Sequence, residues 1–396
     1  MHLEKIRGTE SKKLERKKIL LAVTGSIAAI ESIKLSRELI RRGAEVTGVM
    51  SEDAKKIINP YALEFATDRI VTEITGKIEH VNFVEISDLL LVAPASANTI
   101  SRIANGISDN AVTLFSTSAI GKIPVIIVPA MSESMIENPF IRENISKLKN
   151  NGIEVVEPVY EEKKAKFPPV DLICLYVERA LYKKEMEGKR VIVTSGPTFE
   201  HIDPIRFISN RSSGLMGKEL AFEFWRRGAE VIHITSKPTG LRLYDFTEVV
   251  VRSVNDMLYA SLNEVRKGCD LFVSSAAPSD FTVEKAEDKM KTSDEITLKL
   301  RAAPKIIKEL RKIYEGTIIG FKAETGVSDE ELYRIAYEKM VEDRLQMVVA
   351  NDVKEKGMGT EDTRVLLLTE KREEWAEGSK VEVAERIVRA YLEDCP

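Results

Sequence analysis

An internal repeat constrains the fold of this chain more than any other feature of its sequence. The hexapeptide Arg-Arg-Gly-Ala-Glu-Val occurs twice, at residues 41–46 and at residues 226–231. A β-branched strand that ends in a glycine-containing loop precedes each copy, and an apolar strand led by Asp88 or Asp270 comes after it. Strands that alternate with helices in this way are typical of parallel α/β sheets. The repeat therefore predicts an α/β protein with two doubly wound, Rossmann-like, three-layer domains, one in each half.

The length of the chain agrees with this division. A chain of 396 residues can form two domains that each bury a core of their own. A charged stretch at residues 183–189 comes after a predicted helix at residues 170–182. We therefore expect one domain over residues 1–188 and a second over residues 189–396.

Composition and charge narrow the classes of partner. The chain has 59 Lys and Arg against 63 Asp and Glu, a net charge of −4 that gives no reason to expect nucleic-acid binding. Cys174, Cys269 and Cys395 lie far apart without a metal or disulfide pattern, as in proteins of a reducing cytosol. The first 18 residues are charged and lack an apolar signal core, and the run at residues 19–30 is too short to span a bilayer. We expect a cytoplasmic protein that does not bind membranes.

The loop of the second half has the composition of an anion-binding site. Its strand ends at Thr194, and a helix is predicted to begin at about Leu215. Between them lie polar or glycine residues that can contact an anion: His201, Arg206, Asn210, Arg211, Ser212, Ser213 and Gly214, with Gly217 just inside the helix. Unpaired N–H groups and the helix dipole at such a junction attract phosphate. An ordinary strand-to-helix turn is the alternative, but the number of polar side chains favours a nucleotide site.

The strand ends of the first half carry small residues instead. The loop at residues 25–29 and the strand end at residues 93–99 would let a flat ring approach the backbone closely. Gly25-Ser26-Ile27 does not continue as a G-x-G-x-x-G fingerprint, so nothing points specifically to NAD. Two further polar turns come later, at residues 105–110 and 129–135.

In the first half, His80 is the histidine that we consider as a candidate base or polarising donor. It lies where a helix is predicted to begin, ahead of the strand that starts at Asp88. A helix N-terminus disfavours imidazolium, and a neutral ring suits a base or a polarising donor. A partly exposed surface histidine is the alternative, and the spacing alone favours that alternative.

These motifs, in this order, resemble the bifunctional coenzyme A biosynthesis flavoproteins. That family joins a phosphopantothenoylcysteine decarboxylase to a phosphopantothenate–cysteine ligase. In the first half the resemblance rests on residues 23–29, His80, and residues 93–97, 105–110 and 129–131. In the second half it rests on residues 196–198, 203–206, 208–217, 276–280, 289–291, 320–325 and 350–353.

For the second half, the resemblance implies a ligase that consumes CTP. A carboxylate attacks the α-phosphate of CTP, and the amine of cysteine then displaces CMP from the acyl-cytidylate. Asn210 and Lys289 are the implied catalytic residues, Arg206 binds substrate, and Asp280 holds Mg²⁺. The implied CTP contacts are Ser212, Gly214, Ser275, Ala276, Ala277, Asp280, Lys289, Pro304, Lys305, Ile306, Ile307, Phe321 and Lys339.

For the first half, the resemblance implies FMN and a decarboxylase with His80 as its base. The implied FMN contacts are Gly25, Ser26, Ile27, Ala28, Ser51, Ala93, Pro94, Ala95, Ser96 and Asn98. The implied contacts to phosphopantothenoylcysteine are Asn105, Asp109, Ala130, Met131 and Ser132. The family also forms trimers through its flavin half and dimers through its ligase half, with a dodecamer as its arrangement. We therefore expect a homo-oligomer that acts on small molecules.

Three departures from the family pattern leave questions open. Ser132 replaces an asparagine that contacts the substrate carboxylate, and residues 163–169 lack the flap cysteine of the final reduction. Cys174 is predicted to be a buried helix residue rather than its replacement. Asp343 replaces a CTP-binding lysine, and the neighbouring Arg344 is a candidate to supply the missing charge. Two alternatives remain: a ligase whose first half only binds flavin and assembles, and a nicotinamide-dependent reductase.

Overall fold

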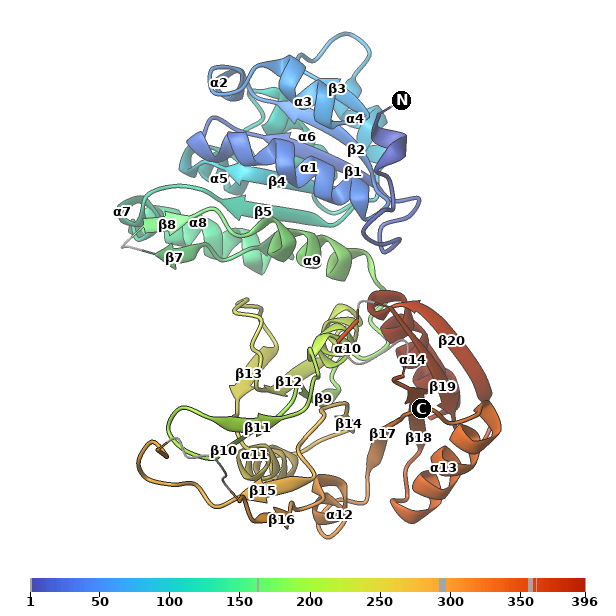
Figure 1. Ribbon diagram of the computed structural model, residues 1–396. Coiled ribbons are helices and arrows are strands. Elements are labelled where there is room, and N and C mark those ends of the chain that lie inside the picture. The colour runs from blue at the N-terminus through green and yellow to red at the C-terminus, as the bar shows by residue number, and fades with distance from the viewer. Residues whose placement is uncertain (1, 162–163, 292–296, 355–358, 361, 396) are drawn as a thin grey trace. The chain divides into compact units, whose positions relative to one another are not determined.

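The computed structural model describes residues 2–161, 164–291, 297–354, 359–360 and 362–395 (Figure 1). The chain forms two compact units, Met1–Tyr182 and Lys183–Pro396. Each unit has its own sheet and its own helices, and each is described by itself.

The sheet of the first unit is parallel and has the strand order β3-β2-β1-β4-β5-β6. Its central strands are apolar on both faces because helices cover both sides, so nearly every residue of β1 and β4 is buried. The strands are β1 (Lys18–Val23), β2 (Glu45–Met50), β3 (Arg69–Val71), β4 (Leu89–Ala95), β5 (Val125–Pro129) and β6 (Glu154–Val155).

The helices of this unit form two groups. α1 contacts both α3 and α9, whereas α4, α5, α6 and α8 form a second set, whose apolar residues such as Phe115 pack on Leu20 and Val92 of the sheet. The helices are η1 (Leu3–Lys5), η2 (Ile27–Ile30), α1 (Glu31–Arg41), α2 (Glu52–Lys55), α3 (Pro60–Ala66), α4 (Glu79–Glu85), α5 (Ala97–Ala104), α6 (Ala111–Ala119), α7 (Glu133–Ile136), α8 (Pro139–Asn150) and α9 (Val170–Leu181). A short hairpin, β7 (Val159–Glu161) and β8 (Lys164–Lys166), precedes α9.

The sheet of the second unit has the order β13-β12-β9-β14-β17-β18-β19-β20. It is parallel as far as β18, and β19 and β20 add an antiparallel edge. The strands are β9 (Arg190–Ser195), β12 (Glu230–Thr235), β13 (Phe246–Val250), β14 (Leu271–Ser274), β17 (Thr317–Glu324), β18 (Met347–Asp352), β19 (Asp362–Leu368) and β20 (Glu373–Ser379).

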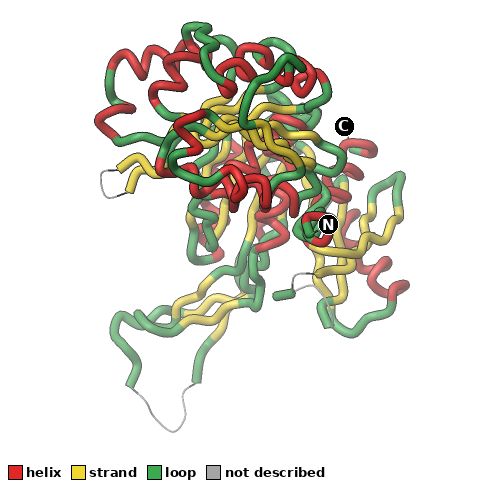
Figure 2. Tube along the Cα trace, turned by 90° about the horizontal axis from the view of Figure 1, so that it is seen from above, coloured by secondary structure: helices red, strands yellow, loops and turns green. Residues whose placement is uncertain are grey.

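Helices α11, α12 and α13 pack on one face of this sheet around Phe272 and Ile318, while α10 packs against α14. Their bounds are α10 (Leu215–Arg226), α11 (Val254–Arg266), α12 (Ile306–Leu310), α13 (Asp329–Glu342) and α14 (Lys380–Asp394). Two hairpins lie in contact and form an arm that extends from the unit (Figure 2). They are β10 (Phe199–His201) with β11 (Phe207–Ser209), and β15 (Phe281–Val283) with β16 (Leu300–Ala302).

In both units, the repeated hexapeptide ends one helix and begins the next strand. Gly43 and Gly228 end α1 and α10 with φ angles of +102° and +100°, which a residue with a side chain rarely adopts. The next strand then begins with equivalent main-chain hydrogen bonds, from Glu45 N–H to Lys17 O at 2.8 Å and from Glu230 N–H to Lys189 O at 2.9 Å. The predicted pair of doubly wound α/β units is confirmed.

The order in which successive strands are added to the sheet changes direction at equivalent places in both units. β1 lies between β2 and β4, and β9 lies between β12 and β14. The loop after β1 therefore leaves its sheet in the opposite direction to the loop after β4, and the loops after β9 and β14 diverge in the same way. Each pair of loops opens a crevice at the carboxyl edge of its sheet, which is where open α/β sheets bind ligands. The glycine loops at Gly25 and Gly196 start at these crevices.

Candidate functional site

A cavity of about 820 Å³ lies at the crevice of the second unit. Its walls come from segments far apart in the sequence: the loops after β9 and β14, the start of α12, the ends of β17 and β18, and one face of α13. Every residue that the sequence assigned to CTP, except Lys289, lines this cavity, and so does Asn210. Its volume is within the range that holds small-molecule ligands.

The loop before α10 is shaped for close approach. Gly214 occupies the position before the helix with φ +77° and has no side chain to cap it, while the Oγ of Ser213 accepts from the N–H of Leu215 at 3.4 Å. A Cβ atom on Gly217 would lie 2.3 Å from the Cβ of Ser195 and 2.5 Å from the Oγ of Ser275. Met216 and Gly217, in the first turn of this twelve-residue helix, line the cavity, and a helix N-terminus in that position favours a phosphate or carboxylate.

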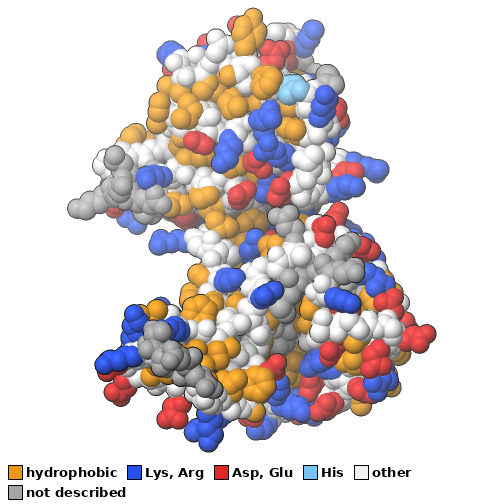
Figure 3. All heavy atoms as spheres, viewed as in Figure 1, with side chains coloured by type: hydrophobic (Ala, Val, Ile, Leu, Met, Phe, Trp, Pro, Cys, Tyr) orange, Lys and Arg blue, Asp and Glu red, His pale blue; other side chains and the backbone are white. Residues whose placement is uncertain are grey.

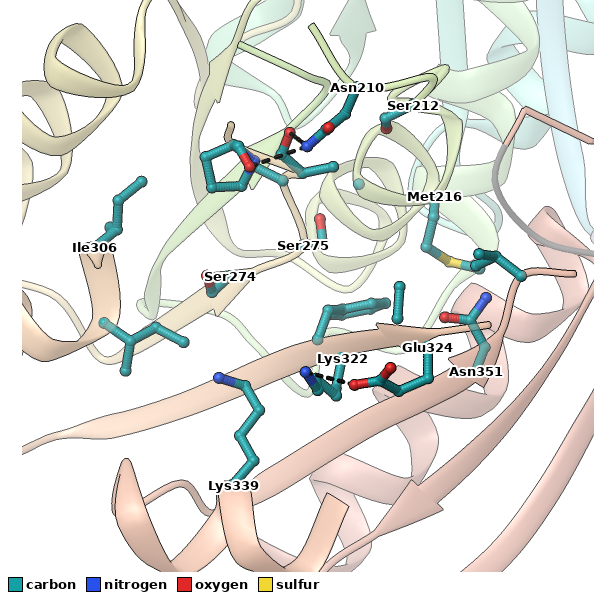
Figure 4. Close-up of a pocket in the computed structure, with 18 of the residues that line it drawn as sticks. Asn210, Ser212, Met216, Ser274, Ser275, Ile306, Lys322, Glu324, Lys339 and Asn351 are labelled. Carbon is teal, nitrogen blue, oxygen red and sulfur yellow. Dashed lines mark hydrogen bonds and ion pairs between the residues drawn. The ribbon is translucent and has the colours of Figure 1, made fainter. Parts of the chain in front are cut away.

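Asn210 ties two walls of the cavity together. Its Nδ2 donates to the carbonyl oxygens of Ala277 at 3.1 Å and Pro278 at 3.0 Å (Figure 4). The amide is thus already held in place, and a ligand carbonyl could receive its N–H only by replacing one of these bonds.

Arg206 and Lys289 do not line the cavity as described. Arg206 donates from Nη1 to the Oδ2 of Asp203 at 3.2 Å and to the carbonyl oxygen of Met290 at 3.3 Å. Met290 N–H in turn donates to the same Asp203 carboxylate, which is completely buried. N–H donors led by that of Ile205 lower the pKa of Asp203 and keep it charged. This clamp fixes the segment that carries Lys289, whose own side chain is exposed.

Four ion pairs lie along the cavity wall, and one of them joins Lys308 to Glu342 at 2.6 Å. Lys305 pairs with Asp280 at 2.5 Å and Lys339 with Asp343 at 2.7 Å. Lys322 pairs with Glu324 at 2.8 Å (Figure 4). The cavity therefore contains cations for an anionic ligand; the lysines of these four pairs are each neutralised by a carboxylate, whereas Lys380 donates to the carbonyl oxygen of Thr360.

The candidate residues of the first unit lie along one edge of its sheet. Gly25 to Ala28 come directly after β1, Ser51 after β2 and Ala130 after β5, and residues 93–98 span the end of β4. Thr24 joins two of these loops, because its Oγ1 donates to Pro94 O at 2.8 Å and accepts from Ser96 N–H at 3.0 Å. The structure thus gathers Gly25, Ser26, Ile27, Ala28, Ser51, Ala93, Pro94, Ala95, Ser96 and Asn98 at a single crevice.

The serine hydroxyls at this edge organise helix starts. Ser26, Ser51 and Ser96 accept hydrogen bonds from the main chain at the N-termini of η2, α2 and α5. Gly25 has no room for a side chain, because a Cβ atom there would lie 2.4 Å from the Cβ of Asp53. By contrast, Ile27 is 75% exposed, so the crevice is open on that side.

His80 is the second residue of α4, where the sequence predicted a helix to begin. Its Nδ1 is buried and has no hydrogen-bond partner among the described residues. A buried imidazole nitrogen without a partner is costly in a protein interior, and a ligand or a neighbouring chain can supply the missing bond.

The residues assigned to the decarboxylase substrate are separated into two turns. Asn105 donates to Ser101 O at 2.8 Å, and Asp109 lies 3.3 Å from the guanidinium of Arg102. Ser132 is exposed, and its hydroxyl contacts that of Ser134 at 3.1 Å. Ala130 and Met131 lie between the end of β5 and α7, beside the crevice of the sheet.

Comparison with known proteins identifies both halves. The family model of the DNA/pantothenate metabolism flavoprotein C-terminal domain matches residues 186–394, and the flavoprotein model matches residues 7–181. A coenzyme A biosynthesis bifunctional protein of Thermococcus kodakarensis is 48% identical over 93% of this chain and 92% of its own length. The chain belongs to this family. The Methanocaldococcus jannaschii member is 43% identical over 98% of this chain and 96% of its own length.

Among solved structures, the C-terminal domain of a coenzyme A biosynthesis bifunctional protein is similar to part of the chain. It is 30% identical, with a TM-score of 0.43, and the match covers 53% of this chain and 97% of that one. None of the described helices has the length and apolar character that crossing a membrane requires.

The departure at Asp343 can be followed in the structure. Its neighbour Arg344 is not among the cavity residues. The Nη1 of Arg344 pairs with Glu315 at 2.9 Å, and its Nη2 donates to Arg311 O. The expectation that Arg344 replaces the lost cavity lysine is therefore not supported. The replacement of the family lysine by Asp343 has a second effect, because the carboxylate of Asp343 pairs with the ammonium of Lys339 and neutralises its charge.

The flap departure is described only in part. Lys163 lies outside the described residues, and of Lys164 only the backbone position in β8 is described. Cys174 is completely buried in α9, as the sequence predicted, and burial raises the pKa of its thiol to about 12. A thiol in that state is a poor proton donor and a poor nucleophile.

Sequence reasoning missed several cavity residues of this family member. Lys322, Glu324, Asn351 and Lys380 line the cavity but had no assigned role. Lys322 and Glu324 could have been found, because residues two apart at the end of a strand face the same side. Lys380 could not, since it comes after the strand β20 and reaches the cavity only through the antiparallel edge of the sheet.

Proposed function

We propose that this chain carries out two consecutive steps of coenzyme A biosynthesis. The domain at residues 189–396 ligates 4′-phosphopantothenate with cysteine at the expense of CTP, through an acyl-cytidylate. The domain at residues 1–188 then decarboxylates phosphopantothenoylcysteine to 4′-phosphopantetheine with FMN. Family membership supports both steps. One structural observation carries the ligase assignment: the residues that the family resemblance assigns to CTP and to catalysis, apart from Lys289, come from five separated segments and line a single cavity.

In the ligase, the cavity would hold the two reactants end to end. The start of α10 and the loop at Ser212 to Gly214 suit a phosphate group, and the walls at Ala276 and Ile306 suit a nucleoside. Attack of the pantothenate carboxylate on the α-phosphate releases pyrophosphate, and Lys289 would offset the charge that develops there. Because the Asp203 clamp holds the backbone next to Lys289, this role needs the exposed side chain to swing toward the nucleotide.

Magnesium fits this site with one protein ligand. Mg²⁺ commonly binds one or two carboxylates together with substrate phosphates. Asp280 could provide the carboxylate, since its partner Lys305 is 62% exposed and free to move to a phosphate. Among the described residues no cluster of three metal-ligating side chains exists, which agrees with a metal that arrives with the nucleotide.

In the decarboxylase, the residues at the first crevice fit FMN. The backbone from Gly25 to Ala28 and the end of β4 would flank the ring system, and the orphaned Nδ1 of His80 marks a place where a partner is missing. FMN held there would supply reversible hydride transfer at the thiol-bearing carbon, the chemistry that makes loss of CO₂ easy. His80 would hold the proton exchanged during this step.

A second candidate function is a ligase whose first domain only binds flavin and assembles. The buried state of Cys174 favours it, because that thiol cannot replace the flap cysteine. The partnerless His80 favours retained decarboxylation. Water or Ser132, which is exposed, could protonate the intermediate in place of the flap cysteine.

We also propose that the chain is a homo-oligomer built from two kinds of contact. The first domain exposes large apolar side chains near its crevice, including Ile27 at 75% and Tyr61 at 79%, and hydrophobic side chains gather on the face of this unit seen in Figure 3. The arm of the second domain exposes Phe207 and Phe281 at 50% and 52%. Apolar patches of this kind mark protein–protein contacts. Trimers of the first domain joined by dimers of the second would give a dodecamer.

One experiment tests both assignments. The purified chain is incubated with 4′-phosphopantothenate, cysteine, Mg²⁺ and CTP, and the products are monitored by mass spectrometry. We expect phosphopantothenoylcysteine and then 4′-phosphopantetheine, with an absorbance band of bound flavin at about 450 nm. Accumulation of phosphopantothenoylcysteine alone would support the ligase-only alternative. Full turnover with ATP and none with CTP would refute the nucleotide assignment.

A further inference from the structure

The strand β17 ends inside the cavity with two opposite charges on one side. Lys322 and Glu324 are two residues apart, so their side chains leave the strand on the same face. The Nζ of Lys322 lies 2.8 Å from Oε1 of Glu324, and the two side chains are 35% and 29% exposed. Asn351, from the neighbouring strand β18, lies beside Glu324 in Figure 4. All three residues line the cavity.

This ion pair is available to a ligand. Among the described residues, no other ion pair or side-chain hydrogen bond involves the Lys322 ammonium or the Glu324 carboxylate. Solvent-accessible ion pairs of lysine and glutamate contribute little net stability, so the pair can open at small cost. The pair Lys339–Asp343 differs in this respect, because its carboxylate residue is only 8% exposed.

The sign of the charges indicates the ligand. A phosphate group would be repelled by Glu324 once Lys322 turned toward it, so this part of the wall is poorly suited to the triphosphate. A neutral group would leave both charges without a better partner. A zwitterion that carries an ammonium and a carboxylate on one carbon atom can satisfy both at once, with its ammonium on Glu324 and its carboxylate on Lys322.

We propose that Glu324 and Lys322 bind the incoming α-amino acid of the ligation, with its ammonium on Glu324 and its carboxylate on Lys322. The inference rests on the proposed ligase function and names the subsite for its second substrate. Asn351 can donate or accept at the edge of the same subsite. The pair thereby holds the amine within the cavity that contains the loop at Asn210 and the start of α10.

The test uses two substrates that differ only in the carboxylate, cysteine and cysteamine. In Lys322→Met, we expect the KM for cysteine to rise by about tenfold while the KM for cysteamine stays within about twofold, because only cysteine has the carboxylate that Lys322 binds. In Glu324→Gln, the KM should rise by about tenfold for both amines. The matched control variants are Lys312→Met and Glu309→Gln. Each breaks the ion pair between Lys312 and Glu309, whose Nζ and Oε2 lie 2.7 Å apart and which does not line the cavity.

A half-reaction separates this inference from the proposed function. Release of pyrophosphate from CTP and phosphopantothenate in a single turnover, without any amine, reports acyl-cytidylate formation. We expect both variants to retain this burst, which also shows that they fold. Equal effects of Lys322→Met on cysteine and cysteamine, or unchanged KM values in both variants, would overturn the amino-acid subsite. Absence of the burst from the unmodified chain would refute the ligase itself, and the inference with it.

Discussion

The two crevices of this protein are built on the same strand order but are closed to different degrees. In the second unit, the loops after β9 and β14 meet α12, α13 and the ends of β17 and β18, and together enclose a cavity of about 820 Å³. In the first unit, the loops after β1 and β4 carry Ile27 and Asn98 into solvent. The same topology therefore produces one site that a single chain encloses and another whose rim is exposed.

The difference lies in the elements that extend each sheet beyond its central strands. The second sheet continues through β17 and β18, and α13 packs beside them to supply the far wall. The first sheet ends two strands beyond β4, at the short β6. In the proposed homo-oligomer, a second copy of the chain would cover the exposed apolar rim and could supply a partner for the buried Nδ1 of His80, which has none among the described residues.

The largest expected effect separates the two sites by chemistry. Lys289→Gln should lower the rate of acyl-cytidylate formation by about a hundredfold or more, because it removes the charge that offsets the reacting phosphates. His80→Asn should lower decarboxylation by a similar factor and leave ligation unchanged. Product analysis by mass spectrometry with each intermediate supplied separately measures both. Loss of both activities in either variant would mean that the sites are not independent.

The next effect tests how each rim is completed. Ile27→Asp places a charge on a side chain that is 75% exposed in the single chain but buried in the proposed contact. We expect light scattering to show smaller assemblies. We also expect the flavin absorbance at about 450 nm to fall by about tenfold. Ile205→Asp, at a 61% exposed position of the arm, serves as the matched variant and should change assembly but retain flavin. Full flavin content in a monomeric Ile27→Asp protein would refute the shared site.

A smaller effect compares the two glycine loops directly. Gly217→Ala forces a Cβ to within 2.3 Å of Ser195, and Gly25→Ala to within 2.4 Å of Asp53. Overpacking of this kind costs about 1–3 kcal/mol, and we expect guanidinium unfolding to show it for both. Gly76→Ala, with no atom within 4 Å of the added carbon, is the control and should change stability by less than about 0.5 kcal/mol. Only Gly217→Ala should also raise the KM for CTP.

The smallest expected effect concerns the departure at Asp343. Asp343→Asn keeps the shape of the side chain but removes the charge that pairs with Lys339 at 2.7 Å. The freed ammonium should lower the KM for CTP by about threefold, in the range that single ion pairs contribute. Glu331→Gln, which breaks an ion pair with Arg334 on the same helix outside the cavity, should leave that KM unchanged. An unchanged KM in Asp343→Asn would show that Lys339 does not contact the nucleotide.

Sequence could predict the fold because the fold depends on short local patterns, whereas the residues expected at the ligase cavity came from the resemblance to the family. The repeat at Gly43 and Gly228 marked each helix end, and apolar runs marked the buried strands. The arm was not predicted, because strands of three residues such as β10 and β15 have too little alternation to detect. The clamp of Asp203 on Met290 joins residues 87 apart in sequence and depends on the arm, so no local pattern could reveal it.

The position of Arg344 could not be predicted from sequence for a related reason. Adjacent residues at the end of α13 project in different directions, and Arg344 adopts a left-handed conformation with φ +51°. Its guanidinium therefore reaches Glu315, whereas Asp343 remains at the cavity. A positive charge on the adjacent residue Arg344 therefore does not occupy the place in the cavity that the side chain at position 343 occupies.

The order of strands along the chain has a consequence for synthesis on the ribosome. All six strands of the first sheet lie before residue 156, and its last helix, α9, ends at Leu181. The first unit can therefore complete its hydrogen-bonded sheet while the second is still being translated. In the second unit, β9 emerges first but belongs in the middle, and it must wait for β12 and β14 to cover its two edges. Nascent chains arrested near residue 230 should thus present a folded first unit with one unpaired, aggregation-prone strand after it.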